Sequence, residues 1–317
     1  MSPKPQPKRK ARPNKEPKFT AWKGPVRVAA VQFDMRAVAS FAEFAQRCEF
    51  FVKSAADYQA DFVLFPELLT NPLLALVKES RPTQTARRLS EFTEVYVEIF
   101  KKFATQNQIN IIAGSHLTVE DNKLYNIAYL FRRDGSVAQQ RKIHITPSEK
   151  KSWGVEPGKH IEVFDTDRGR IALVICYDIE FPELTRIAVA KGANLLFVPF
   201  NTDLRSGYFR VRYCAQARCV ENNIYCVLSG ACGNLPQVFG ADIHYAQSCI
   251  LTPSDIPFAR DGIAAEATAN IETMIVHDVD LGLAESTRTN GSVRTWVDRR
   301  ADVYRVTYLS DGKAEQV

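Results

Sequence analysis

The segment Ile175–Leu184 reads ICYDIEFPEL and follows directly on the apolar run Arg170–Ile175, RIALVI. An apolar run of this length, bounded by turn residues, is typical of a buried strand. Helical spacing begins at Pro182, and proline is favoured in the first turn of a helix. Cys176 is therefore expected just beyond the end of a strand, where reactive side chains from several strands can converge on one cleft.

Three other segments place reactive groups just after apolar runs. They are FPE at 65–67, RKIH at 141–144 and TPSE at 146–149. A thiol, a carboxylate and an ammonium are the group types that acyl transfer through a cysteine needs when no histidine takes part. The thiolate attacks, a carboxylate in a water-poor pocket accepts its proton, and a fixed ammonium stabilises the oxyanion. Glu67, Lys142 and Cys176 supply the three groups.

Strand-like and helix-like segments alternate along the chain, with hairpin signals between some of them. Strands are expected over 26–33, 61–65, 109–114, 124–131, 137–145, 161–164, 170–175, 194–200, 224–229, 246–251 and 268–281, and helices from 41 to about 55 and over 83–108, 182–192 and 208–222. The pattern favours sheets covered by helices with mixed pairing, an α/β fold class. Since no linker follows residue 24, one domain over 25–317 is expected.

These motifs, in this order and spacing, resemble the nitrilase superfamily of carbon–nitrogen hydrolases, and the likeness runs from about Val26 to Leu281. The resemblance implies a four-layer αββα sandwich that forms a homodimer or a higher homo-oligomer. It implies that Glu67 deprotonates Cys176 and that Lys142 holds the oxyanion, together with a backbone N–H after the nucleophile, that of Tyr177. Many members carry a second glutamate after the lysine.

Glu149 is the best candidate for that second glutamate, and an ordinary role as a loop or capping carboxylate is an equal alternative. His144 lies two residues after Lys142, so it lines the pocket if the strand persists, or is a satisfied histidine at a strand end. Asp178 is expected to pack or form hydrogen bonds near the turn after Cys176.

Departures from the family pattern bear on the substrate. The Cys-Tyr-Asp sequence differs from the Cys-Trp-Glu of nitrile-cleaving members and favours hydrolysis of a small amide. Glu180 stands where many amidase-like members have arginine. In the segment 201–212, Arg205, Arg210 or Arg212 is a candidate to bind a substrate carboxylate, which would make the amide anionic.

Other functions stay open at this point. Within the family, the alternatives are hydrolysis of N-carbamoyl amides or of nitriles. An acyltransferase would use the same thioester with a different acceptor. A catalytically silent scaffold on the same fold is an alternative of another class, although a scaffold has no need of the Glu67, Lys142 and Cys176 set.

Composition limits partners and cofactors. The formal net charge of the chain is +5. Residues 1–24 carry +7, so the other residues together carry −2. We expect a disordered basic tail and a body without specific nucleic-acid binding. No apolar run is long enough to cross a membrane. The odd number of seven cysteines, without a secretory signal, favours a reducing cytoplasm. Neither metal-ligand spacing nor a phosphate loop is present, so no metal or cofactor is expected.

Overall fold

The computed structural model describes residues 22, 24–77, 79, 81–236, 238, 241–310 and 313–316. The predicted basic tail therefore lies almost entirely outside the described residues. Trp22 and Gly24 are the described residues of that segment.

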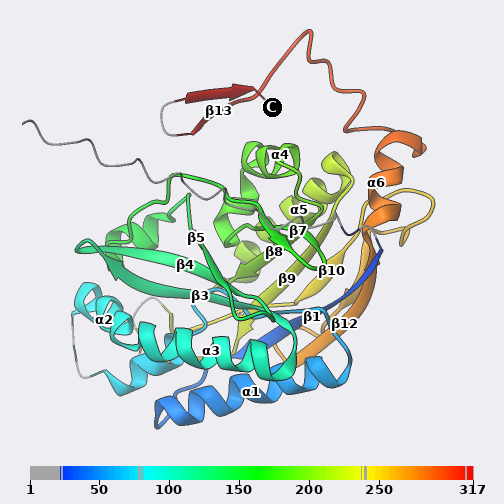
Figure 1. The fold of residues 1–317 in the computed structure, drawn as a ribbon. Coiled ribbons are helices and arrows are strands. Elements are labelled where there is room, and N and C mark those ends of the chain that lie inside the picture. The colour runs from blue at the N-terminus through cyan, green and yellow to red at the C-terminus, as the bar shows by residue number, and fades with distance from the viewer. Residues whose placement is uncertain are drawn as a thin grey trace, which may run out of the picture.

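Two six-stranded sheets face each other at the centre of the molecule (Figure 1). The first has the order β12-β1-β2-β3-β4-β5 and the second β11-β10-β9-β8-β7-β6. They join where the end of β1 pairs with the end of β9, at Phe33 with Ala231 and Asp34 with Cys232. The strands are β1 Pro25–Asp34, β2 Phe62–Leu64, β3 Asn110–Glu120, β4 Lys123–Phe131, β5 Val137–Arg141, β6 Phe164–Thr166, β7 Gly169–Leu173, β8 Leu195–Phe200, β9 Tyr225–Cys232, β10 Cys249–Leu251, β11 Ile263–Glu266 and β12 Thr273–Asp280.

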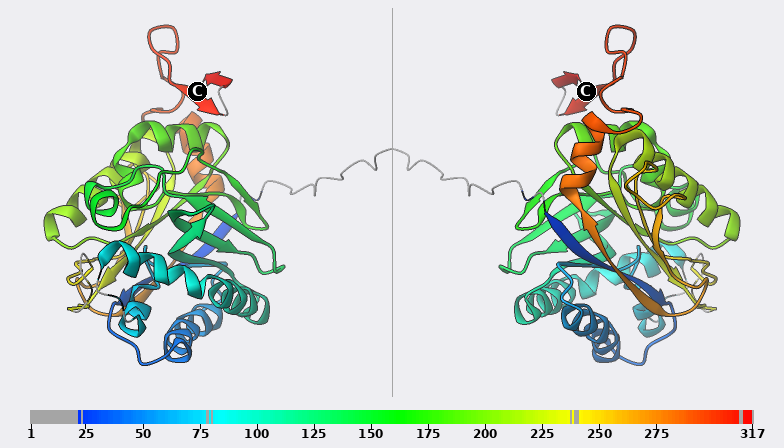
Figure 2. Two further views of the ribbon diagram at one scale, coloured as in Figure 1. Left: turned by 90° about the vertical axis from the view of Figure 1, so that its left-hand side faces the viewer. Right: turned by 90° about the vertical axis from the view of Figure 1, so that its right-hand side faces the viewer.

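Helices cover the outer face of each sheet (Figure 2). The helix α1 lies against the first sheet, and α4 and α5 lie on the opposite side against the second. The helical elements are α1 Phe41–Asp57, η1 Asn71–Leu76, α2 Pro82–Arg88, η2 Leu89–Phe92, α3 Thr93–Asn107, η3 Glu149–Trp153, η4 Cys176–Glu180, α4 Pro182–Ala190, α5 Arg205–Asn222 and α6 Leu281–Asn290. A short hairpin, β13 Thr307–Ser310 and β14 Lys313–Gln316, follows near the C-terminus.

The alternation of side chains along β1 explains the layers. Val26, Val28 and Ala30 belong to the core between the two sheets, whereas Val31 and Phe33 belong to the core beneath α1 and α3. Successive side chains of a strand point to opposite faces, so a strand that is apolar on both faces must be covered on both. The expected α/β class and αββα sandwich are confirmed.

The helix expected over 83–108 is interrupted. The chain forms α2, tightens through η2 and only then continues as α3. Ser90 in the interruption accepts a hydrogen bond from the N–H of Val119 at 2.8 Å, through its side-chain oxygen. This tertiary contact with β3 lies at the point where the helix that the apolar spacing predicts is interrupted.

The strand expected over 137–145 ends earlier, at Arg141. Beyond Lys142 the backbone N–H groups of Ile143 and His144 donate to the carboxylate of Asp178 at 3.2 and 2.7 Å. Because these two N–H groups bond to Asp178 and not to a neighbouring strand, the chain turns away from β4.

Other boundaries differ from the predicted ones by a few residues. The helix α6 begins within the end of the strand expected over 268–281.

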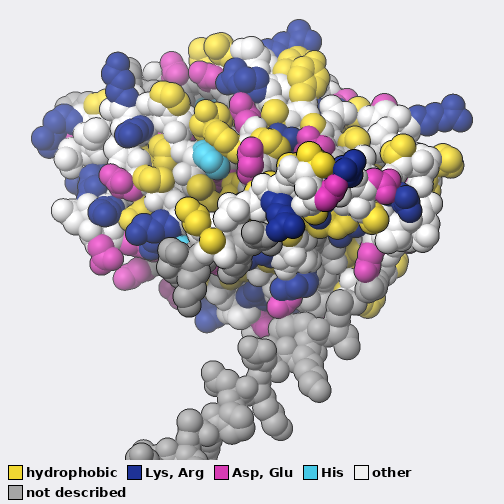
Figure 3. Space-filling view, turned by 90° about the horizontal axis from the view of Figure 1, so that it is seen from above, with side chains coloured by type: hydrophobic (Ala, Val, Ile, Leu, Met, Phe, Trp, Pro, Cys, Tyr) yellow, Lys and Arg dark blue, Asp and Glu magenta, His cyan; other side chains and the backbone are white. Residues whose placement is uncertain are grey.

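Charges are intermixed on the surface seen in Figure 3, where lysine and arginine alternate with aspartate and glutamate among apolar side chains. This agrees with a nearly neutral body. Within the part of the chain that the structure describes, no helix combines the length and the apolar character needed to cross a membrane.

Candidate active site

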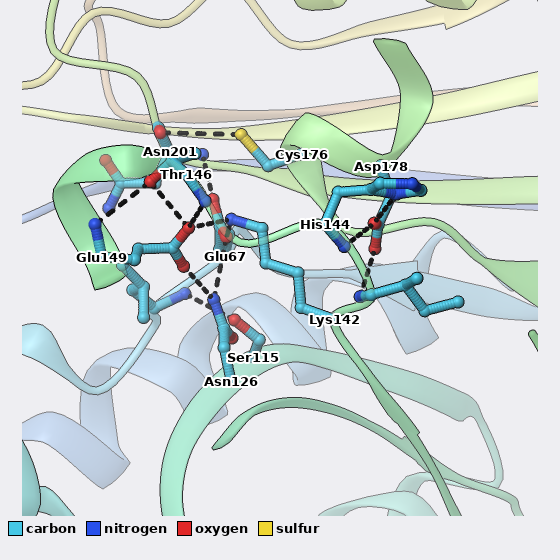
Figure 4. A network of polar contacts seen from close by, with 12 residues as sticks. Glu67, Ser115, Asn126, Lys142, His144, Thr146, Glu149, Cys176, Asp178 and Asn201 are labelled. Carbon is cyan, nitrogen blue, oxygen red and sulfur yellow. Dashed lines mark hydrogen bonds and ion pairs between the residues drawn. The ribbon is translucent and has the colours of Figure 1, made fainter. Parts of the chain in front are cut away.

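The candidate site lies at one edge of the two sheets, where four strands end. Glu67, Cys176 and Asn201 follow the parallel strands β2, β7 and β8, and Lys142 follows β5. β5 runs in the same direction as β3 because both pair antiparallel with β4. Carboxyl ends of strands that run the same way meet at one edge, which is where α/β proteins bind ligands. Figure 4 shows these side chains pointing toward one another.

Glu67 is held by a tight contact between two chain segments. The backbone N–H of Leu68 donates to the side-chain oxygen of Ser115 at 2.9 Å. Gly114 has φ of +64°, and a β-carbon there would lie 1.9 Å from the carbonyl oxygen of Pro66. A β-carbon strains this conformation and leaves no room for the close approach, so Gly114 fixes the path of the chain immediately before Glu67.

Lys142 lies between two carboxylates. Its Nζ donates to Glu67 Oε1 and to Glu149 Oε2, each at 2.7 Å. The side chains of all three residues are more than nine-tenths buried. Asn126 donates from Nδ2 to the same two carboxylates, at 2.9 Å to Glu67 and 3.0 Å to Glu149. Charged groups buried this deeply are stable only when paired and hydrogen-bonded, which this network provides.

Glu149, for which the sequence left two roles open, belongs to this network. Thr146 donates to Glu149 Oε2 from its backbone N–H at 3.0 Å and from its hydroxyl at 2.9 Å. Glu149 also begins η3, so both readings of the sequence apply: it stabilises a local turn and it faces the buried lysine.

Cys176 begins η4 with φ of +46°, in the left-handed region that residues with a β-carbon rarely adopt. Backbone strain of this kind persists where the surrounding structure imposes it, as at active sites. The thiol donates to the carbonyl oxygen of Asn201, with Sγ 3.7 Å from that oxygen, and the charge of Glu67 acts on the thiol. The backbone N–H of Asn201 donates to the other oxygen of Glu67 at 3.1 Å.

The charges around the thiol set the protonation states. Burial raises the pKa of Glu67 above its ordinary value, and the charge of Glu149 adds to this, while Lys142 acts in the opposite direction. Burial and the charge of Glu67 raise the pKa of Cys176 well above that of a free thiol, against the opposing charge of Lys142. Cys176 therefore rests as a thiol beside a carboxylate that is suited to accept its proton.

Lys142 and Glu149 are held as ions. Burial disfavours the ammonium, but Glu149 and Glu67 together raise the pKa of Lys142 well above its ordinary value. Burial acts to raise the pKa of Glu149 as well. The charge of Lys142 and hydrogen bonds from Lys142, Asn126 and Thr146 outweigh it, so the pKa of Glu149 is lowered.

Asp178 links the segment that bears Lys142 to the one that bears Cys176. Besides the two backbone N–H groups, its carboxylate contacts Nδ1 of His144 at 2.8 Å. The His144 ring stacks on Phe181 with ring centres 3.6 Å apart. The strand does not persist to His144, which is a satisfied histidine at a turn, and Asp178 forms the hydrogen bonds expected near the turn after Cys176.

A cavity of about 690 Å³ opens onto this network. Its charged or reactive lining residues include Glu67, Lys142, Glu149, Cys176, Glu180, Asp203 and Arg210, and Tyr177 lines it as well. Nδ2 of Asn201, another lining residue, is buried without a hydrogen-bond partner among the described residues. It is therefore available to a molecule in the cavity.

Two of the arginines proposed to bind a substrate carboxylate are not among the residues that line this cavity. Arg212 is buried and donates from Nη1 to the hydroxyl of Tyr208 at 2.7 Å and to Glu266 at 2.5 Å. Arg205 packs over the ring of Phe209. The helix periodicity of α5 explains this correction, because Gly207, Arg210 and Val211 share the face toward the cavity and the other two arginines project elsewhere.

Sequence reasoning missed Asn126 and Asn201. Asn126 is a buried polar residue within the otherwise apolar run LYNIAYLF of β4, and that interruption was the available signal. Asn201 contributes mainly backbone groups, which a side-chain pattern does not reveal. Within the described residues, no group of three or more His, Cys, Asp or Glu side chains could hold a metal ion.

The fold and this site define a hydrolase of the nitrilase type, with Cys176, Glu67 and Lys142 in one cavity. The family model of carbon–nitrogen hydrolases matches residues 27–289, so the chain belongs to the carbon–nitrogen hydrolase family. Members of this family are enzymes that act on carbon–nitrogen bonds other than peptide bonds.

Among curated proteins, the chain is 52% identical over 284 residues to a probable hydrolase, YhcX, of Bacillus subtilis. That match covers 90% of this chain but 55% of the relative, so the chain spans about half of that protein's length. It is 28% identical over 296 residues to the omega-amidase NIT3 of Saccharomyces cerevisiae, covering 88% of this chain and 94% of that one. The amidase-like branch expected from the Cys-Tyr-Asp motif is confirmed.

Among solved structures, Saccharomyces cerevisiae Nit3, of branch 10 of the nitrilase superfamily, superposes with a TM-score of 0.73 at 25% identity. The match covers 89% of this chain and 99% of that one. The Caenorhabditis elegans NitFhit protein superposes with a TM-score of 0.75 at 22% identity, over 90% of this chain and 67% of that one, and shows the same fold.

Proposed function

We propose that this protein hydrolyses the carbon–nitrogen bond of a small amide through a thioester on Cys176. The observation that carries the proposal is the position of Lys142 Nζ, 2.7 Å from both Glu67 and Glu149, beside a buried thiol in an open cavity. Relatives that are named omega-amidases support an amide as the substrate class.

In the first step, Glu67 accepts the proton of the Cys176 thiol while the sulfur attacks the amide carbonyl carbon. The raised pKa of Glu67 suits it to this task near neutral pH. The negative charge that develops on the carbonyl oxygen is stabilised by Lys142 and by the backbone N–H of Tyr177. Glu67 then gives its proton to the leaving nitrogen, the carbon–nitrogen bond breaks, and ammonia or an amine departs.

In the second step, Glu67 accepts a proton from water, which attacks the thioester carbonyl. The carbon–sulfur bond breaks, the sulfur regains a proton, and the carboxylic acid leaves. Glu149 does not transfer a proton in this scheme. Its lowered pKa keeps it ionised, and it keeps Lys142 an ammonium.

The test is to trap the thioester. The protein is incubated with a set of primary amides, quenched in acid and digested, and the Cys176 peptide is searched by mass spectrometry for an acyl adduct while released ammonia is measured. We expect both signals in the native protein and neither in Cys176→Ala. Cys214→Ala, at a half-buried cysteine that does not line the cavity, is the matched control and should retain both.

The alternatives give different outcomes when N-carbamoyl amides, nitriles and an acceptor amine are added to the same experiment. Adducts and ammonia only from N-carbamoyl amides or only from nitriles would replace the amide as substrate. Acyl transfer to an added amine in preference to water would identify an acyltransferase. No adduct and no ammonia from any compound, with Cys176 alkylating no faster than the other cysteines, would support the scaffold.

We also propose a homodimer, or a larger homo-oligomer, in a reducing compartment such as the cytoplasm. Tyr213 and Val220 of α5 are exposed apolar side chains, with exposed fractions of 62% and 39%, and would be covered by a second copy. The seven cysteines favour the reducing compartment. Light scattering after gel filtration measures the mass, and a monomer would contradict the first part. Fluorescence of a tagged chain in cells would locate it.

A further inference from the structure

The cavity carries more acidic than basic groups. Among its lining residues, the acids are Glu67, Glu149, Glu180 and Asp203, and the bases are Lys142 and Arg210. With all of them ionised the lining has a formal charge of −2. At the inner end, Glu67 and Glu149 outnumber Lys142 by one charge. At the outer end, Glu180 and Asp203 outnumber Arg210 by one charge.

The inner ammonium is not available to a carboxylate on the substrate, because an ammonium has three N–H groups and the proposed function uses the third for the oxyanion. Lys142 already donates to two carboxylates at 2.7 Å, and its side chain is 1% exposed. A carboxylate on the substrate would have to rely on Arg210 at the outer end. That arginine already faces Glu180, with Nε 3.5 Å from Oε2.

Glu180 and Arg210 differ in how far their side chains are exposed to solvent. The side chain of Glu180 is 16% exposed and that of Arg210 is 64% exposed. A pair that is 3.5 Å long and whose arginine lies largely in solvent contributes little free energy. A cation that enters the cavity can therefore replace Arg210 at the carboxylate, whereas Glu180 cannot easily move into water.

Glu180 is also placed along the path that a substrate would occupy. It ends η4, the 3₁₀ helix that Cys176 begins, and a 3₁₀ helix repeats every three residues. Tyr177 and Glu180 therefore lie on the same side, and both line the cavity. A rise of about 2 Å per residue puts the backbone of Glu180 roughly 8 Å from that of Cys176.

We propose that the pocket selects amides that carry a protonated amine at the far end from the scissile amide, joined by a short aliphatic spacer. Glu180 binds the ammonium group by charge-assisted hydrogen bonds, and Asp203 adds negative charge at the rim. This rests on the proposed function and names its substrate class. It reverses the charge preference expected from the arginines of 205–212, of which only Arg210 lines the cavity.

The experiment compares three series of primary amides matched in chain length: ω-ammonio amides, uncharged alkyl amides and ω-carboxylate amides. We expect kcat/KM of the native protein to be about tenfold higher for the best ammonio amide than for the matched alkyl amide, and lowest for the carboxylate. Glu180→Gln should remove most of this preference, measured as the ratio of the two kcat/KM values within one protein preparation.

Glu183→Gln is the matched control. It makes the same change three residues away on the exposed surface of α4, outside the cavity, and should leave the ratio as it is. The proposal is overturned if the native protein prefers the carboxylate series, or if Glu180→Gln leaves the ammonio preference intact. Turnover of the uncharged amide by the native protein, absent in Cys176→Ala, tests the proposed function separately. If the native protein turns over no amide of the three series, the proposed function itself is wrong.

Discussion

Glu67 and Glu149 contact the same ammonium and receive hydrogen bonds from the same Asn126, yet they behave differently. Glu149 accepts two further hydrogen bonds from Thr146, and its pKa is lowered. Glu67 has one further backbone donor, from Asn201, and faces the thiol, and its pKa is raised. Neighbouring donors, rather than the residue type, determine which carboxylate can exchange protons.

The two carboxylates therefore have different roles. Glu67, after β2, is suited to transfer a proton, whereas Glu149, after β5, provides a fixed charge. Pairs of titratable groups whose environments move their pKa values apart are the usual basis for assigning a base and a stabilising ion. The predictions below test this assignment, beginning with the largest expected effect.

Glu67→Gln should reduce kcat/KM for the best amide by about 10³-fold, the typical contribution of a general base. Glutamine keeps the shape of the side chain but cannot accept the proton of Cys176. Steady-state ammonia release measures the effect. A loss of less than about threefold would contradict the assignment of Glu67 as the base.

Glu149→Gln should reduce kcat/KM less, by about 10- to 100-fold, since Lys142 would lose one of its two anionic partners. The charge of Glu149 also raises the pKa of Glu67, so its removal should move the acid limb of the pH–rate profile to lower pH. Profiles of both proteins with the same amide measure the shift. An acid limb that disappears in this variant would assign the proton transfer to Glu149 instead.

The native protein should lose activity by about tenfold for each pH unit below the pKa of its base. Since the pKa of Glu67 is raised, this limb should lie at a higher pH than the ordinary value of a glutamate, near 4.3. The sign follows from the role, because the base must be ionised and protonation removes it. A profile flat down to pH 4 would contradict a base with a raised pKa.

Asp178→Asn should have the smallest effect on activity, a loss of about three- to tenfold, and should lower the free energy of unfolding by about 1–3 kcal/mol. Asp178 holds Ile143 and His144, and through them Lys142, against the turn of Cys176. Urea denaturation and kcat/KM measure the two effects. An acid limb that also moved substantially would show that Asp178 influences Glu67 and does more than hold the two segments together.

Much of the fold is readable in the chain, for reasons that are local. The apolar runs of β1, β2 and β8 and the helical spacing of α1 and α4 record which faces are buried, and burial is what stabilises these elements. The predictions of a helix over 83–108 and a strand over 137–145 fail where the segment bonds to a distant part of the chain, Ser90 to the backbone of Val119 and the backbone of His144 to Asp178. Such contacts leave no periodic trace.

The sequence by itself determined the reactive residue types and the strand ends on which Glu67, Lys142 and Cys176 lie. Only the tertiary structure decided which groups meet. It joined Asn126 and Glu149 to Lys142, directed Arg212 to Glu266 instead of the cavity, and left Glu180 facing a solvated arginine. The physical reason is that charge and hydrogen bonding depend on distance and burial, and residues far apart in the chain acquire both only when the sheets have formed.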